Sequence, residues 1–237
     1  MKNLVTIILD QLDHFIQKKN IKVLKKNLSK RIDFYVDVGA HNGEMINTIS
    51  NNFNVKKIFA FEPNPECLNN LKNIKKSNLK IFEYALGNKK KNEDLNIGYI
   101  SSMSSINNID NKSFYSKLKK IVIGLFYFKS KVYKKKIRIR VRTLSEILIQ
   151  NKLQKIDLLK IDTEGYELNV LIGLEKFIKK TKIILLECHY DDSLIKNYNF
   201  RSLNFFFTQN RFKLISKNKM LLRKGYELIY KNQRNFK

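Results

Sequence analysis

Short apolar runs alternate with amphipathic stretches along most of the chain. Apolar runs rich in β-branched or aromatic residues predict strands at Phe34–Val38, Ile58–Phe61, Leu79–Leu86, Ile156–Ile161 and Ile183–Glu187. Apolar residues at helical spacing predict helices at Glu44–Phe53, Glu66–Lys75 and Glu167–Ile178. Strands that alternate with helices favour a parallel sheet covered by helices on both faces. The sequence therefore predicts an α/β fold.

The two ends of the chain follow other patterns. Residues 1–33 begin with apolar residues near helical spacing, which predicts an amphipathic helix and linker that cover a sheet edge. These residues are Leu4, Ile8, Leu12, Phe15 and Ile16. Phe212–Ser216 and Glu227–Tyr230 are separated by a polar stretch too short for a crossover helix, so an antiparallel hairpin is expected. We expect one domain over residues 34–237, with an insert at about 110–142.

The net charge of +26 is large, and such a balance is typical of proteins that bind nucleic acid, anionic membranes or acidic substrates. Only eight of the 47 basic residues are Arg, however, and dedicated phosphate-binding proteins favour Arg. The abundant Lys, Asn and Ile fit a low-GC coding bias as readily as a binding function. Nucleic acid is therefore not the expected partner.

Composition also limits the cellular setting. Cys67 and Cys188 form no CxxC pair and have no histidine cluster at metal-ligand spacing, which predicts a reducing, cytoplasmic location and no metal centre. The apolar runs at Leu4–Leu9 and Ile121–Phe128 are far shorter than the roughly 20 residues that cross a bilayer. No transmembrane segment is expected.

Candidate chemistry first appears where the first predicted strand ends. Asp37, Gly39 and Gly43 occupy a strand-to-helix turn, where glycines let the backbone approach a ligand. Glu62 ends the next strand, at a position suited to hydrogen bonds with ribose hydroxyls. An ordinary tight turn would explain the glycines alone. The spacing differs from the G-x-G-x-x-G of nicotinamide enzymes, and an acid in place of a phosphate cradle suits S-adenosylmethionine, which carries positive charge and no phosphate.

Five sequence blocks resemble the FkbM-type methyltransferase family in content and order. They are FYVDVGAHNG (34–43), FEPNP (61–65), ALG (85–87), DLLKIDTEGYE (157–167) and LLECH (185–189). The resemblance implies a Rossmann-like class I methyltransferase fold with a mostly parallel seven-stranded sheet, and S-adenosylmethionine as cofactor. The cofactor-binding residues that it implies are Asp37, Gly39, His41 and Gly43 near the methionine part, Glu62 and Pro63 at the ribose, Ala85 and Leu86 near the adenine, and Asp162. For His41, shaping the backbone or bordering the substrate is favoured over catalysis.

Two carboxylates follow the fourth predicted strand, at the edge where ligands of open α/β sheets bind. Asp162 and Glu164 could polarise an acceptor hydroxyl, because mutual repulsion raises the pKa of one of them. Alternatively, Thr163 or Asp162 caps the following helix while Glu164 and Glu167 complement its dipole. The two interpretations are compatible.

His189, at the end of the fifth strand, is a candidate general base. Asp162 is the rival for that role, and a hydrogen-bonded residue at a strand end is the structural alternative. A divalent ion held by Asp162, Glu187 and His189 is the least favoured hypothesis.

A basic segment separates the third and fourth blocks of the resemblance. No acidic residue stands between Asp110 and Glu146, and Ile137, Ile139 and Val141 alternate with three arginines, which predicts a half-buried strand with the guanidinium groups on one face. That face is either simply solvated or part of a lid or docking surface over residues 117–142 for an anionic acceptor or a lipid headgroup. Peripheral membrane contact would follow from the latter. The preceding serines at 101–105 could contact the cofactor or the acceptor.

The sequence thus predicts an S-adenosylmethionine-dependent methyltransferase that acts on a hydroxyl of a sugar or of a glycan or glycolipid acceptor. An RNA or nucleotide methyltransferase is an alternative, although no N/D-P-P-Y/F motif or RNA-binding module is recognisable. A non-enzymatic binding module for anionic surfaces is the third hypothesis.

Overall fold

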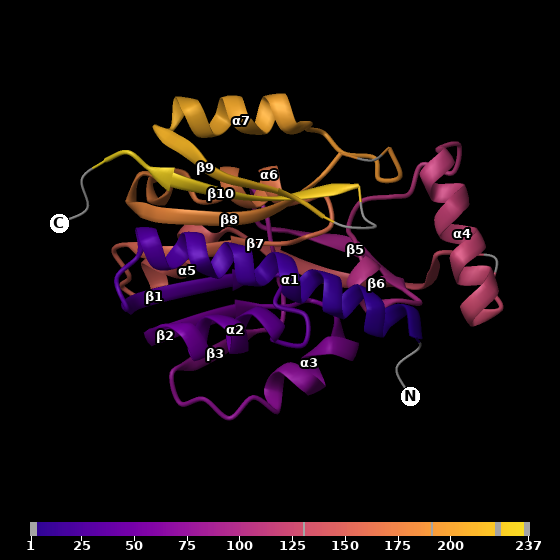
Figure 1. The fold of residues 1–237 in the computed structure, drawn as a ribbon, viewed down its shortest axis with the longest axis horizontal. Helices are drawn as coiled ribbons and strands as arrows, with labels where there is room; N and C mark the ends of the chain where they lie inside the picture. Colours follow the sequence, from indigo (N-terminus) through magenta and orange to yellow (C-terminus); the bar gives the residue numbers. More distant parts are fainter. Residues whose placement is uncertain (1–3, 130, 191, 221–223, 235–237) are drawn as a thin grey trace.

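The main sheet of the computed structural model has seven strands in the order β3-β2-β1-β7-β8-β10-β9 (Figure 1). The structure describes residues 4–129, 131–190, 192–220 and 224–234. The strands are β1 (Arg31–Val38), β2 (Asn54–Phe61), β3 (Leu79–Phe82), β7 (Ile156–Ile161), β8 (Thr181–His189), β9 (Phe212–Lys219) and β10 (Gly225–Asn232). The first five in sheet order are parallel, and β10 pairs antiparallel with both β8 and β9. The predicted α/β fold with a C-terminal hairpin is confirmed.

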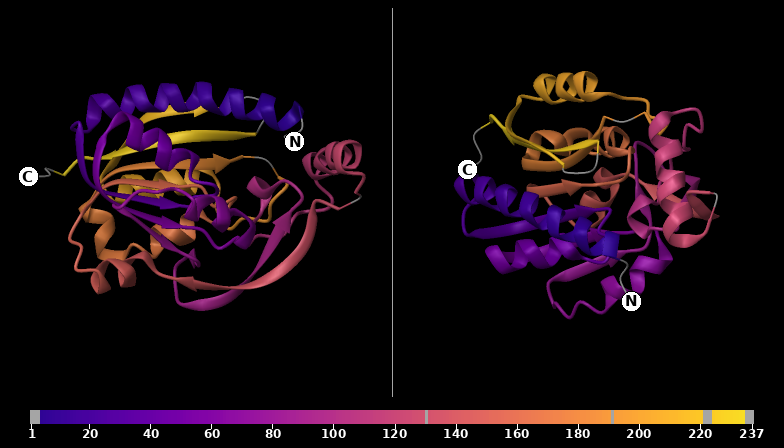
Figure 2. Two further views of the ribbon diagram at one scale, coloured as in Figure 1. Left: turned by 90° about the horizontal axis from the view of Figure 1, so that it is seen from below. Right: turned by 45° about the vertical axis from the view of Figure 1, so that its right-hand side comes forward.

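Helices cover both faces of this sheet. They are α1 (Leu4–Asn27), α2 (Glu44–Asn52), α3 (Pro65–Lys72), α5 (Leu144–Gln150), α6 (Glu167–Ile172) and α7 (Phe200–Gln209). One apolar core contains Leu24 of α1, Ile46 of α2 and Leu71 of α3. A second core contains residues of α5, α6 and α7. Figure 2 shows α1 and α5 on opposite sides of the sheet.

Helix α1 crosses a face of the sheet, and the prediction that it covers an edge is wrong. Ile21 and Leu24 are buried in the same cluster as Ile32 of β1 and Ile229 of β10. β1 also starts at Arg31, three residues before the predicted boundary, so the helix leads into the sheet with almost no linker. The side chains of residues 4–14, including the predicted apolar positions Leu4, Ile8 and Leu12, lie outside the described part.

A second sheet of three strands, β4-β6-β5, flanks the first. Its strands are β4 (Ala85–Leu86), β5 (Lys91–Gly98) and β6 (Tyr133–Arg142). The single strand predicted over 79–86 is therefore split, because β3 pairs with β2 while β4 pairs with β6. In β6, Ile139 and Val141 are buried and Arg138 and Arg140 are exposed, which confirms the predicted alternation.

The predicted helix over 167–178 is also divided, into α6 and the short 3₁₀ helix η2 (Glu175–Lys180). The helix ends at Ile172, and its C-cap is Gly173, where an added Cβ would lie 2.0 Å from the Gly87 carbonyl oxygen. That close approach needs a glycine at this position. A further helix, α4 (Phe114–Tyr127), and the 3₁₀ helix η1 (Ser101–Met103) lie between β5 and β6. Among the described helices, none combines the length and apolar character needed to span a bilayer.

Candidate active site

A cavity of about 910 Å³ opens at the carboxyl ends of the central parallel strands. Its wall is made by the ends of β1, β2 and β7 with the loops that follow them, by residues within β8, and by the segment 100–106 and parts of α1 and α2. Cofactor and ligand pockets typically occupy about 300 to 1,000 Å³. The position is the one at which open α/β sheets bind ligands.

Two glycines shape the turn between β1 and α2. Gly39 has φ +74°, and an added Cβ would lie 1.8 Å from the carbonyl oxygen of Asp162, so β1 and β7 can approach only because position 39 has no side chain. Gly43 has φ +87°, and its Cβ would lie 2.1 Å from Cδ1 of Ile74. Gly39 lines the cavity, whereas Gly43 shapes the turn from behind.

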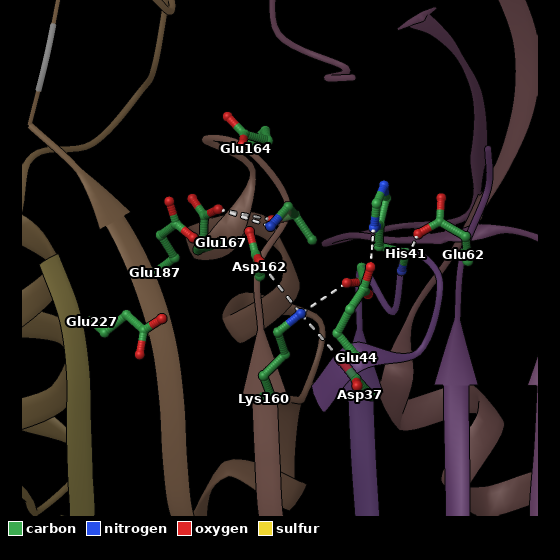
Figure 3. A network of polar contacts seen from close by, with 12 residues as sticks. Asp37, His41, Glu44, Glu62, Lys160, Asp162, Glu164, Glu167, Glu187 and Glu227 are labelled. Atoms are coloured by element: carbon green, nitrogen blue, oxygen red, sulfur yellow. Dashed lines mark hydrogen bonds and ion pairs between the residues drawn. The ribbon is translucent and has the colours of Figure 1, made fainter. Parts of the chain in front are cut away.

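The Glu62 carboxylate joins two loops at the cavity wall (Figure 3). Its Oε2 accepts a hydrogen bond of 2.8 Å from the His41 backbone N–H, and its Oε1 accepts one of 2.8 Å from Asn64. Burial raises the pKa of Glu62, and the two backbone hydrogen bonds partly offset that rise. Glu62 and Pro63 both line the cavity.

The loop after β2 is fixed locally by its sequence. The Asn64 side chain accepts a hydrogen bond of 3.1 Å from the Glu66 backbone N–H, and Pro65 occupies the first turn of α3. Both are preferred helix-start residues. The loop is therefore held in place from both sides, by the cap and by Glu62.

Asp37 lies beneath the cavity, with no exposed surface. Its carboxylate accepts a hydrogen bond of 2.9 Å from the Tyr35 hydroxyl and lies 3.3 Å from the Lys160 ammonium. Lys160 lines the cavity, but Asp37 is not among the lining residues. Direct contact between Asp37 and a ligand would need Lys160 to move, so the predicted role of Asp37 stays a prediction.

Lys160 links the floor of the cavity to its wall. Its ammonium also donates a hydrogen bond of 2.8 Å to the Gly39 carbonyl oxygen and lies 3.4 Å from Asp162 (Figure 3). Burial lowers the pKa of Lys160, but the two aspartates outweigh burial and raise it. The lysine therefore carries a positive charge between two acids.

Asp162 and Glu164 both line the cavity, on the loop between β7 and α6. Burial is the largest influence on Asp162, and together with the Glu187 and Glu164 charges it raises the pKa to about 7 against the opposing effect of Lys160. Glu164 adopts φ +51°, an uncommon conformation for a residue with a side chain. Strained backbone of this kind is frequent at functional sites.

The same loop is organised by Glu167 rather than by a side-chain cap. Glu167 Oε1 accepts hydrogen bonds from the backbone N–H groups of Thr163 and Gly165, each 3.0 Å long, and from the Thr163 hydroxyl. The N-cap of α6 is Tyr166, with no side-chain cap hydrogen bond. The alternative in which Thr163 or Asp162 caps this helix is therefore wrong, although Glu167 does lie in its first turn.

His189 lies behind two cavity-lining carboxylates. Its Nε2 is 2.9 Å from Glu187 Oε1 and 3.3 Å from Glu164 Oε2, and its side chain is 6% exposed. One ligand atom from each of the three residues lies within 4.8 Å of the others, an arrangement with the spacing of a metal site. This grouping contains Glu164 in place of the Asp162 of the sequence-based metal hypothesis.

Serines of the segment 100–106 connect the loops around the cavity. Ser101 Oγ lies 2.8 Å from His41 Nε2, and the Ser105 hydroxyl donates a hydrogen bond of 2.7 Å to the Glu164 carbonyl oxygen. Ser104 accepts a hydrogen bond from the Gly98 backbone N–H. The segment thus forms part of the cavity wall and contacts both the loop after β1 and the loop after β7.

His41 is held by contacts at both ring nitrogens. Its Nδ1 lies 3.0 Å from Glu44 Oε1, opposite the contact with Ser101. Burial lowers the pKa of His41, but contacts with Cys67 and Glu44 outweigh burial and raise it to about 10. This arrangement fixes the ring at the cavity wall, where His41 is a lining residue.

The lining side chains have a charge opposite to that of the whole protein. Six carboxylates line the cavity, from Glu44, Glu62, Asp162, Glu164, Glu187 and Glu227. Lys160 is the one lysine or arginine among the lining residues of the described chain. A chain with 47 basic and 21 acidic residues thus gathers six acids at one site, which suits a ligand with positive charge.

The structure brings most of the predicted site residues together. Those that line the cavity are Gly39, His41, Glu62, Pro63, Ala85, Leu86, Asp162 and Glu164, whereas Asp37, Gly43 and His189 lie behind the wall. Sequence reasoning missed Lys160, Asn64 and Glu227 as lining residues. Lys160 had a usable signal, because it is a charged residue in the otherwise apolar end of β7. Glu227 had none, since it lies on the C-terminal hairpin.

The profile of the Methyltransferase FkbM domain matches residues 37–214, about three quarters of the chain. The chain belongs to the FkbM methyltransferase family. The matched range includes the turn after β1, the Glu62 loop and the acidic loop after β7. No curated protein sequence matches this FkbM-family chain.

Solved structures share the fold at low sequence identity. The structure of methyltransferase FkbM from Methylobacillus flagellatus KT has a TM-score of 0.56 and 14% identity, over 86% of this chain and 44% of that one. Magnesium protoporphyrin IX methyltransferase from Synechocystis PCC 6803, solved with bound SAM, has a TM-score of 0.56 and 6% identity, over 98% and 86%. A putative RNA methyltransferase from Pyrococcus horikoshii has a TM-score of 0.50 and 10% identity, over 94% and 84%. This FkbM-family chain spans less than half the length of the Methylobacillus protein.

Proposed function

We propose that this FkbM-family protein transfers a methyl group from S-adenosylmethionine to a hydroxyl oxygen of a sugar-like acceptor. The observation that carries the proposal is the acidic cavity of a strongly basic chain, located at the glycine turn after β1. Family membership supplies the reaction class. The negative charge of the cavity indicates which cofactor binds there.

The lining residues fit S-adenosylmethionine. This molecule carries an ammonium and a sulfonium and has no phosphate, so carboxylates stabilise it where they would repel a dinucleotide. Each carboxylate oxygen of Glu62 accepts one hydrogen bond from a backbone N–H and can accept a further one. This capacity suits the two hydroxyls of a ribose. Gly39 leaves room for close approach of the ligand to the backbone. The Synechocystis neighbour with bound SAM supports the same assignment.

When bound, S-adenosylmethionine supplies an electrophilic methyl group on a sulfonium. The protein must then position the acceptor oxygen in line with that methyl group, and such alignment can supply about 7 to 11 kcal/mol of the barrier. Asp162, Glu164 and Glu187 line the same side of the cavity and can accept hydrogen bonds from sugar hydroxyls.

A general base with a pKa near neutral pH would add to the effect of alignment. With its pKa raised to about 7, Asp162 can both accept and release a proton near neutral pH. Glu187 is the second candidate, because His189 lies directly behind it at 2.9 Å. In this arrangement His189 acts on the acceptor through Glu187 rather than by touching it.

The other two hypotheses have weaker support. An RNA acceptor would bring phosphates to a cavity lined by six carboxylates, which costs electrostatic free energy. A non-enzymatic binding module for anionic surfaces gives no reason to keep cavity-lining carboxylates whose pKa values are raised, such as Glu62 and Asp162.

The test is methyl transfer from radiolabelled S-adenosylmethionine to fractionated cell glycans, lipids and RNA. We expect label in the glycan or glycolipid fraction, and loss of the label with the Glu62→Ala variant. Glu83→Ala is the matched control, because Glu83 is half exposed, outside the cavity and paired with Lys72. Label confined to RNA would replace the proposed acceptor, and no label in any fraction would contradict enzymatic activity.

A further inference from the structure

Helix α4 and its C-cap carry a line of exposed apolar side chains. Phe114, Leu118, Ile121, Leu125 and Phe128 are 75, 42, 59, 67 and 88% exposed. Their spacing of four, three, four and three residues places them along one side of the helix, and we call this set the α4 stripe. Contiguous apolar surface of this kind is unusual on a soluble protein and marks a site of interaction.

The opposite side of α4 attaches the helix to the protein. Ser116 and Ile123 are fully buried, and the Ser116 hydroxyl donates a hydrogen bond of 3.3 Å to the Ser193 carbonyl oxygen. Ser116 and Ile123 are roughly half a turn away from the α4 stripe. The stripe therefore points away from the body, and Figures 1 and 2 show α4 at the margin of the molecule.

Positive charge surrounds the α4 stripe. Lys117, Lys129 and Lys131 are exposed, and no acidic residue stands between positions 110 and 146. The charges of β6 are different, because Lys134 is paired with Glu66 and Arg138 with Asp94. The arginine face that the sequence offered as a docking surface is thus partly neutralised. The lysines beside the stripe are the better anion-binding groups.

We propose that the α4 stripe docks on the surface of an anionic lipid membrane. An apolar helix face flanked by lysines is the pattern of helices that lie in the membrane interface, where acyl chains receive the apolar side chains and headgroups receive the lysines. A lipid surface satisfies both features of α4 at once. At 14 residues, α4 would lie in the plane of the membrane rather than cross it.

Docking would also place the cavity near the headgroups. In sequence, α4 follows closely after the segment 100–106, which forms part of the cavity wall. The hydrogen bond from Ser116 to Ser193 also attaches α4 to the segment that follows β8, a strand whose residues line the cavity. The acceptor class that fits this placement is a sugar anchored to the membrane by a lipid. This last step rests on the proposed function, whereas docking itself does not.

The direct test is flotation of the full chain with phosphatidylcholine vesicles, with and without phosphatidylglycerol, and with no S-adenosylmethionine present. We expect binding only to the anionic vesicles. Ile121→Glu/Leu125→Glu should weaken that binding by more than about tenfold, because two apolar side chains lose their place in the interface. Both positions are exposed, so the variant should fold normally. Phe205→Glu is the matched control, since Phe205 is 65% exposed on α7 and should leave binding unchanged.

A second variant, Lys117→Glu, tests the role of charge. It should weaken binding to anionic vesicles about fivefold or more and leave the other properties of the protein unchanged. Equal binding to neutral and anionic vesicles, or no binding by the wild type, would overturn the proposal. So would a dimer in the absence of lipid that Ile121→Glu/Leu125→Glu converts to a monomer, because a second copy would then cover the stripe.

The docking proposal and the proposed function fail separately. Glu62→Ala should still bind anionic vesicles, because the hydrogen bonds of Glu62 to His41 and Asn64 do not involve α4. Vesicle binding without methyl transfer to any fraction would contradict the function and leave docking intact. Methyl transfer without vesicle binding would contradict docking and leave the proposed function intact.

Discussion

The ammonium of Lys160 lies 3.3 Å from the fully buried carboxylate of Asp37. Lys160 itself is 8% exposed, so both charges are removed from water and depend on each other. The pair fixes the end of β7 against the end of β1, directly beneath the cavity.

Loss of one charge should therefore be costly. Lys160→Met leaves Asp37 buried without its counter-charge, which typically costs about 3 to 5 kcal/mol. Urea denaturation should show this loss, and Asp37→Asn/Lys160→Met should recover much of it. A loss below about 1 kcal/mol for the single variant would show that the pair is not needed for stability.

Gly39→Ala tests the close approach of β1 and β7. The new Cβ would meet the Asp162 carbonyl at 1.8 Å, and alanine is strained at φ +74°, so the loop that carries Asp162 must move. We expect lower thermal stability and at least about tenfold weaker S-adenosylmethionine binding. Gly124→Ala is the control, because its Cβ would lie at an ordinary 3.7 Å from the Lys129 carbonyl oxygen and should leave stability unchanged or raise it by up to about 1 kcal/mol. Equal behaviour of the two variants would contradict the account.

The raised pKa of Asp162 predicts a pH dependence of cofactor binding. Below its pKa of about 7 the carboxyl is protonated, so the attraction for a cationic ligand is lost as the pH falls. Titrations from pH 8 to pH 5.5 should show falling affinity for S-adenosylmethionine in the wild type and a flatter profile in Asp162→Asn. An unchanged slope in the variant would assign the dependence to another group.

The raised pKa of Asp162 also predicts that the ionised carboxylate, which favours cofactor binding, lowers the stability of the folded protein. The folded protein binds the Asp162 proton more tightly than the unfolded chain does, so this group lowers stability as the pH rises from the unfolded value near 4 through about 7. Without ligand, Asp162→Asn should melt at a higher temperature than the wild type at pH 8, and the difference should shrink at pH 5. A difference that grows toward acid pH would give the opposite sign and contradict the raised pKa.

Glu187 and His189 should differ in their effects on catalysis. Because Glu187 lines the cavity and His189 lies behind it, Glu187→Gln should lower kcat by about 10² or more, with less than about threefold change in the Kd of S-adenosylmethionine. His189→Gln should lower kcat less and shift the acidic limb of the pH profile, since His189 faces both Glu187 and Glu164. A larger kcat loss for His189→Gln would make His189 the base, as the sequence suggested.

The main sheet was predictable because its central strands are buried on both faces and read as continuous apolar runs. β7 was predicted with the bounds that it has, Ile156–Ile161. β5 was not, because its sequence KNEDLNIG is largely polar and becomes a strand only by pairing with β6. The division between β3 and β4 likewise depends on a tertiary partner.

The site shows the same limit. Motif spacing located Gly39, Glu62 and Asp162 at one cavity, because the ends of adjacent parallel strands must meet. It could not show that Asp37 is covered by Lys160, because burial depends on which neighbour reaches across from β7. Glu227 reaches the cavity from β10, whose place between β8 and β9 no local pattern records.

Isothermal titration of the full chain with S-adenosylmethionine, in parallel with the Glu62→Ala and Glu83→Ala variants, tests most directly whether the acidic cavity binds the cofactor through Glu62. We expect one binding site in the wild type and in Glu83→Ala, and affinity at least about tenfold weaker in Glu62→Ala, because a charge-assisted contact with the ribose is lost. No binding by the wild type, or equal affinity in all three proteins, would contradict cofactor binding through Glu62.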